Sequence, residues 1–167
     1  VGVMNFYARE PGFFTEDLLA TLDEMALDVS FALDNFEREA ERKRAENALR
    51  ESETRYRSLF ENMLNGFAYC RMQYDEHDRP VDFVYLDVNG AFERLTGLKN
   101  VVGKPVTEVI PGIREANPEL FEIYGRVAST GIPETFEIDL KPLRQWFSIS
   151  VYGPEKGYFV AVFDVIT

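Results

Sequence analysis

Few residues of this chain carry reactive side chains. It contains one cysteine, Cys70, and one histidine, His77. A disulfide needs two cysteines and a His/Cys metal site needs several such ligands, so a single chain can build neither from this set. Cys70 lies in an alternating apolar stretch, where we expect a core thiol that behaves as a small hydrophobic side chain. His77 lies in the polar stretch 75–79, where we expect a surface residue rather than a general base.

Other signs of catalysis or of nucleic-acid binding are missing from the sequence. No Walker loop and no kinase motif occurs among the 167 residues, so we predict that this stretch has no enzyme activity. The net charge of −11 argues against binding a nucleic-acid backbone. No apolar run approaches the ~20 residues that cross a bilayer, and no signal peptide opens the chain. We therefore expect a cytoplasmic protein without a membrane segment or a metal site.

The elements that position these side chains centre on residues 83–97. Along 83–88 the aliphatic residues Val84, Leu86 and Val88 alternate with Phe83, Tyr85 and Asp87, which is the period of a strand. Asn89 then suits the N-cap of a short helix, because its side chain can accept the free amide hydrogens of the first turn. Phe92 and Leu95 lie three apart on that helix, and Gly97 suits the left-handed residue that ends it.

Strands and helices alternate with turns from residue 66 onward. Asn117 and the proline after it predict the start of a helix that runs over 118–130 and ends at Gly131. Short helical turns are expected within 102–112. Alternation predicts which strand residues point inward: Ala68, Cys70 and Met72; Val84, Leu86 and Val88; and Phe147, Ile149 and Val151, with Trp146 on the opposite face. Five strands are expected, at residues 67–74, 80–89, 134–140, 144–152 and 157–166.

A long helix precedes these strands. Residues 15–63 contain no proline and no glycine, and Thr15 is a suitable cap. Apolar residues recur at the a and d spacing of a coiled coil, so the helix is expected to bury them in a parallel homodimer. The repeat breaks within the charged run 37–46 and then resumes, which shifts the seam around the helix. The seam residues are Leu22, Ala26, Val29, Leu33, Phe36 and Ala40 before the break, and Ala45, Leu49, Ser52, Tyr56, Leu59 and Met63 after it.

The order of these pieces resembles a known family. The stretch from Asn89 to Gly97, the run Val102-Gly103-Lys104, the helix ending at Gly131, the run Trp146-Phe147-Ser148 and the last strand follow one another as in a PAS sensory domain. This resemblance covers residues 59–167 and implies an α+β fold, with a five-stranded antiparallel sheet and helices on one face. Such domains often end in Asp-Ile-Thr, whereas Asp164 stands one place early here. The resemblance nominates Asp164 and Thr167 as the exit of the signal.

The beginning of the chain resembles a second family. Residues 1–8 are strand-like and residues 14–35 form a helix pattern, as in the last strand and last helix of a GAF domain. This similarity covers residues 1–36, implies that the chain begins inside an interrupted domain, and leaves residues 37–58 as a helical linker. An amphipathic helix with a disordered leader is the alternative for the same residues.

The resemblance to PAS domains also raises the question of a ligand. The Asn-Cys-Arg-Phe-Leu-Gln motif of flavin-binding relatives is absent, and the helix 118–130 lacks the histidine that commonly binds haem, so neither cofactor is expected. The inward residues carry no charge, which leaves either a filled core or a small, weakly polar, uncharged ligand. The candidate lining residues are Cys70, Met72, Leu86, Asn89, Phe121, Tyr124, Phe147 and Ile149.

Two classes of function remain open from the sequence. The chain is expected to be the sensory and dimerisation part of a larger bacterial signalling protein, which acts on an effector domain in the same chain. The GAF-like end, with Ala32-Leu33-Asp34-Asn35-Phe36, and the Arg/Glu-rich helix resemble proteins with GGDEF and EAL domains, which make and degrade cyclic di-GMP. The sensor region of a histidine kinase in a two-component system is the alternative. The second class is a self-contained protein–protein interaction module.

Overall fold

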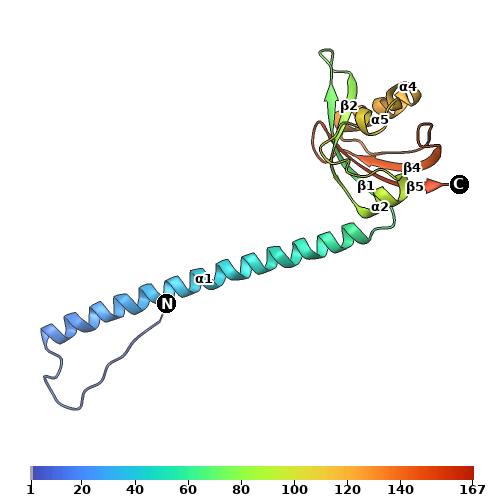
Figure 1. Ribbon diagram of the computed structural model, residues 1–167. Coiled ribbons are helices and arrows are strands. Elements are labelled where there is room, and N and C mark those ends of the chain that lie inside the picture. Colours follow the sequence, from blue (N-terminus) through green and yellow to red (C-terminus); the bar gives the residue numbers. More distant parts are fainter. Residues whose placement is uncertain (1) are drawn as a thin grey trace. The chain divides into compact units, whose positions relative to one another are not determined.

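Two units make up the structure, a computed structural model that describes residues 2–167. The first is Val1–Arg55 and the second is Tyr56–Thr167. The first unit holds a leader without regular structure and most of a long helix. The second holds the last two turns of that helix, a sheet and four further helices (Figure 1).

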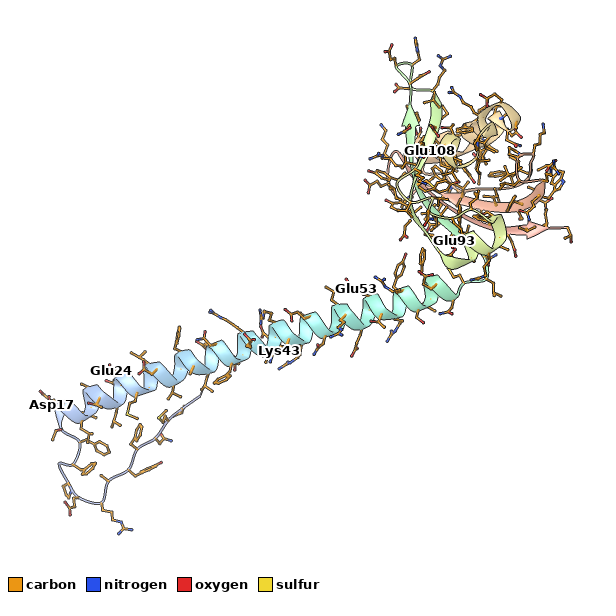
Figure 2. The ribbon with its side chains drawn as sticks, viewed as in Figure 1. Asp17, Glu24, Lys43, Glu53, Glu93 and Glu108 are labelled. Carbon is orange, nitrogen blue, oxygen red and sulfur yellow. The ribbon has the colours of Figure 1, made fainter. Side chains whose placement is uncertain are left out.

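The long helix, α1, spans Glu16–Asn62 and confirms the predicted one. The Thr15 hydroxyl oxygen caps its start by accepting the amide hydrogen of Leu18 at 3.3 Å. Side chains stand out on all sides of it in Figure 2, among them the labelled Glu24, Lys43 and Glu53. The strand expected at residues 1–8 was wrong for residues 2–8, which form no strand, and Val1 lies outside the described residues. Among its described residues the first unit has no strand that could pair with residues 2–8 and take their backbone hydrogen bonds.

The second unit contains the predicted five-stranded antiparallel sheet. Its strands lie in the order β2-β1-β5-β4-β3, so β2 and β3 form its edges. Every neighbouring pair is antiparallel. The strands are β1 Gly66–Tyr74, β2 Pro80–Val88, β3 Glu134–Leu140, β4 Gln145–Tyr152 and β5 Tyr158–Ile166.

Four helices supply the rest of the core. They are α2 Gly90–Thr96, α3 Val106–Val109, α4 Ile113–Ala116 and α5 Pro118–Thr130. Their buried side chains join those of one sheet face in a single apolar cluster. Gly97 and Gly131 end α2 and α5 with φ of 74° and 71°, in the left-handed region that glycine adopts without strain, as the sequence predicted.

Alternation predicted the inward faces of β1 and β4 correctly. Ala68, Cys70 and Met72 are buried, and so are Phe147, Ile149 and Val151, whereas Trp146 on the opposite face is 52% exposed. For β2 the prediction was wrong at Val84 and Leu86. Phe83 and Tyr85 join the core instead, while Leu86 is half-buried outside it and Val84 is buried beside Pro105.

A bulge in β2 explains this change of face. Ala68 pairs with Val88 and Cys70 pairs with Tyr85, so β2 has one residue more than β1 between these two pairs. The extra residue reverses the alternation, because directly opposed residues share a face. Val88 therefore packs against the core as predicted, and Tyr85 takes the place that Leu86 was expected to hold.

Asn117 stands at the N-cap of α5, where the helix start was predicted, but its side chain makes no capping hydrogen bond. Its amide nitrogen donates to the carbonyl oxygen of Asp139 at 2.8 Å, and its side-chain oxygen accepts from the Lys141 amide at 3.2 Å. Because β3 is an edge strand, the backbone groups of Asp139 and of Lys141, just after its end, have no neighbouring strand on this side, and the Asn117 side chain takes these two hydrogen bonds instead. Asn117 thus fastens the start of α5 to the sheet edge.

Candidate functional site

A small cavity lies inside the apolar core between the sheet and the helices. Its volume is about 50 Å³. Residues of all five strands, with Leu140 from the end of β3, line it together with residues of α2, α3, α5 and nearby loops. No charged side chain lines it. The lining residues are Ala68, Cys70, Phe83, Tyr85, Phe92, Thr96, Leu98, Val106, Ile110, Leu120, Tyr124, Leu140, Leu143, Phe147, Ile149, Phe159, Ala161 and Phe163.

The polar groups of the lining are neutral. Burial raises the pKa of Tyr85 and of Tyr124, and also raises the pKa of the Cys70 thiol well above its usual value. All three groups therefore stay protonated at neutral pH. The Thr96 hydroxyl donates to the carbonyl oxygen of Phe92 at 2.7 Å. Such a lining offers hydrogen bonds to an uncharged guest and nothing that balances a charge.

The predicted lining residues separate into two groups. Cys70, Tyr124, Phe147 and Ile149 line the cavity. Met72 and Phe121 are buried in the core outside the lining, whereas Leu86 and Asn89 lie away from it. The main residues that the sequence did not reveal are Phe83, Tyr85 and Phe92. The first two were hidden by the bulge, and Phe92 was recognised only as part of a helix pattern.

Asn89 occupies a junction between three elements. It is only 1% exposed. Its side-chain oxygen accepts the amide hydrogen of Phe92 at the start of α2 and that of Phe67 in β1, both at 3.0 Å. Its amide nitrogen donates to the carbonyl oxygens of Phe60 in α1 at 3.2 Å and of Asn65 at 3.0 Å. Asn89 therefore caps α2, as predicted, and in addition holds the end of α1.

Three further contacts join the end of α1 to the same region. A Glu61 carboxylate oxygen accepts from the Gly90 amide at 3.2 Å. The Arg94 guanidinium donates to the carbonyl oxygen of Met63 at 3.4 Å. The rings of Phe60 and Phe67 meet edge to face with centroids 4.8 Å apart. The last two turns of α1 are therefore bonded to α2 and β1.

Within the first unit, the predicted seam of α1 remains accessible. Leu22 and Ala26 are half-buried. Val29, Leu33 and Phe36 are 40%, 56% and 73% exposed. Apolar side chains at these positions need a partner surface to leave water.

At the predicted signal exit, Asp164 and Thr167, and in the polar turn 75–79, the hydrogen bonds join residues that are close in sequence. The Asp164 carboxylate accepts from the amide of the next residue, Val165, at 2.9 Å, and both Asp164 and Thr167 are exposed. The signal exit at these two residues stays a prediction. His77 is exposed in the predicted turn after β1, where its amide donates to Asp75 at 2.8 Å.

Two features are absent from residues 2–167, a metal-ligand cluster and a membrane-spanning helix. No group of three or more His, Cys, Asp or Glu side chains is arranged to hold a metal ion. In this described part of the chain, every helix is too short or too polar to cross a bilayer.

This chain is similar to a family of known proteins and to solved structures. Residues 54–127 match a family model described as a PAS domain. The chain is similar to the crystal structure of the PAS domain of a protein from Colwellia psychrerythraea, with 19% identity and a TM-score of 0.50 over 68% of this chain and 96% of that one. A domain of an HTR-like protein from Haloarcula marismortui ATCC 43049 aligns with 16% identity and a TM-score of 0.46 over 63% of this chain and 100% of that one. A search of curated proteins found no match.

The second unit therefore has the PAS fold, and residues 54–127 match the PAS family model. The family match includes the Asn89 junction and the elements from β1 to most of α5. A PAS fold is typical of sensory and signalling modules.

Proposed function

We propose that this chain is the sensory and dimerisation module of a larger signalling protein. The observation that supports this function best is the junction at Asn89, which bonds the end of α1 to the PAS domain. A change in the domain can then alter the helix, whose apolar seam is accessible to a partner. A module of this kind passes a stimulus from the domain to an effector in the same chain.

The partner in this proposal is a second copy of the chain, with the two α1 helices parallel. A helix of 47 residues that exposes its apolar seam gains stability by burying that seam in a coiled coil. Light scattering at micromolar concentration is expected to give the mass of a dimer. A monomer of 19.2 kDa under these conditions would refute the proposal.

The effector in this proposal is a GGDEF or EAL domain that makes or degrades cyclic di-GMP. Its support is the resemblance of residues 1–36 and of the Arg/Glu-rich helix to such proteins. Because these reactions use nucleotides, the proposal places the module in the cytoplasm.

The test places residues 1–167 before a diguanylate cyclase domain and measures cyclic di-GMP with and without the substitution Asn89→Ser. Equal output from both would contradict the proposal, and a response only with a histidine kinase domain would favour the kinase alternative.

The cavity is proposed to stay empty or to take a small uncharged guest. Its volume of about 50 Å³ and its neutral lining support this, since a flavin or a haem is far larger and a dicarboxylate needs opposite charge. Native mass spectrometry of freshly purified protein is expected to give the mass of the chain without a bound cofactor. A retained flavin, haem or dicarboxylate would refute the proposal.

A further inference from the structure

We propose that Asn89 is the positioning residue that transmits a change in the cavity to helix α1. Asn89 does not itself line the cavity, but it is hydrogen-bonded to Phe92, which does. It acts through α2, which forms one wall of the cavity, and through the carbonyl group of Phe60, which belongs to the end of α1. The inference rests on the proposed sensory function only in taking the cavity as the place where a stimulus acts.

The part of the cavity wall that α2 forms begins at Phe92, the residue that is hydrogen-bonded to Asn89. Phe92 donates its amide hydrogen to Asn89, and its ring lines the cavity. That ring meets the rings of Tyr85 and Phe163 edge to face, with centroids 5.3 Å and 5.7 Å apart. Thr96 and Leu98, at the end of α2 and just after it, line the cavity too. Phe92 is thus one residue with both the cavity and the Asn89 side chain as neighbours.

The size of the cavity makes movement of a wall necessary. About 50 Å³ accommodates no more than a few water molecules, so a larger guest must displace side chains or backbone. The sheet strands are held by continuous hydrogen-bond ladders, and α5 has thirteen residues with six of them buried. Helix α2 has only seven residues, of which Ala91 and Phe92 are buried. We therefore expect the short helices α2 and α3 to yield before the sheet and α5, and of these two only α2 is hydrogen-bonded to Asn89.

Movement of α2 reaches α1 because the two helices share hydrogen bonds. Asn89 bonds the Phe92 amide and the Phe60 carbonyl with the same planar amide group, so its two ends cannot move independently. Glu61 and Arg94 add exposed contacts between the same segments. Asn89 is the buried contact of this set, and water competes least for its bonds.

Serine at position 89 separates the two tasks of the asparagine. Its hydroxyl oxygen can still accept the Phe92 amide hydrogen, so α2 stays capped. It has a single O–H in place of the two amide hydrogens and is shorter, so the bonds to Phe60 and Asn65 are lost. The matched control is Asn117→Ser, because Asn117 is also 1% exposed and also joins a helix to the sheet, at a place remote from α1 in sequence.

The test uses xenon as a probe of the cavity and the amide signals of residues 56–65 as the readout, by NMR on the full chain. Xenon enters small apolar cavities without any specific chemistry. It should shift signals of the core and of residues 56–65 in the unmodified chain and in Asn117→Ser. In Asn89→Ser the core shifts should remain while those of residues 56–65 fall at least about threefold, as expected when a coupling contact is removed.

Three results would overturn the inference. They are core shifts in the unmodified chain without any change at residues 56–65, a full response in Asn89→Ser, and an equal loss in Asn117→Ser. Should xenon leave the core signals unchanged, Ala161→Val enlarges a lining residue instead, and unaltered signals at 56–65 in that variant would count against the inference. The oligomeric state is measured separately, so a monomer that shows the Asn89 effect contradicts the proposed dimer alone.

Discussion

Two helices of this protein reach stability by different routes. Helix α5 has thirteen residues, and six of them are buried against the sheet. Helix α1 has 47 residues, and only Phe60, in the part of the helix that belongs to the second unit, is buried. Most helices in proteins are stabilised by packing of an apolar face rather than by intrinsic propensity. α5 finds that packing within its own chain, whereas α1 exposes apolar side chains, which in the proposed dimer a second copy of the chain would cover.

Charged side chains in the seam of α1 should dissociate the proposed dimer. Val29→Glu combined with Phe36→Glu places carboxylates at two seam positions, and burying them without partners is strongly unfavourable. The dimer dissociation constant should rise about 100-fold or more, which corresponds to at least ~2.8 kcal/mol. Light scattering over a dilution series measures it.

The control for this prediction lies on the same helix outside the seam. Leu27 and Phe31 are 71% and 69% exposed, and neither belongs to the predicted a or d positions. Leu27→Glu combined with Phe31→Glu should leave the dimer intact. Dissociation by the control pair, with the seam pair still dimeric, would place the interface on the other face of α1.

A large-to-small substitution in the core of the second unit should have the next largest effect. Ile149 is 2% exposed on the inner face of β4, so Ile149→Ala should reduce the free energy of unfolding by ~2–5 kcal/mol. Ser150→Ala, on the outer face of the same strand, should change it by less than about 0.5 kcal/mol. Urea unfolding measures both, and equal losses would contradict the assignment of the two faces.

A glycine in α5 tests how closely that helix is packed. A Cβ atom added at Gly125 would lie 2.6 Å from side-chain atoms of Pro80 in β2. Gly125→Ala raises helix propensity by ~1 kcal/mol, but the overpacking costs ~1–3 kcal/mol, so a net loss of about 1 kcal/mol is expected. Ser58→Ala in α1, where the side chain is exposed and lies outside the predicted seam, should not destabilise the protein. Stabilisation by Gly125→Ala in urea unfolding would show that α5 has more room than its contacts indicate.

The smallest effect is expected from an ion pair at the end of α5. Arg126 donates two hydrogen bonds to Glu134, at 2.6 and 2.8 Å, and this lowers the pKa of the Glu134 carboxyl group. A lowered pKa stabilises the fold above the ordinary pKa of glutamate, and this contribution is lost as the pH falls through the lowered value. Glu134→Gln should therefore slightly destabilise the protein at about pH 7 and leave it unchanged at about pH 2. Equal effects at both pH values would contradict this account.

The sequence by itself determined the elements whose signals are local. The absence of proline and glycine over residues 15–63 indicated α1, and the positions of Gly97 and Gly131 marked the ends of two helices. Alternation in β1 and β4 gave the correct inward faces, because a regular strand has a period of two. The antiparallel sheet followed from the order of these elements and from the resemblance to PAS domains.

Only the tertiary structure decided the features that depend on contacts between distant residues. The bulge at Leu86 is visible from the pairing of β2 with β1, and it replaced Leu86 with Tyr85 in the core. Asn89 was recognisable as a cap from its neighbours in sequence, but its bond to Phe60 lies 29 residues away. Asn117 shows the same limit, since its side chain serves β3 and not its own helix. A local pattern fixes the period of an element, whereas a side-chain amide bonds whichever backbone group the fold brings within reach.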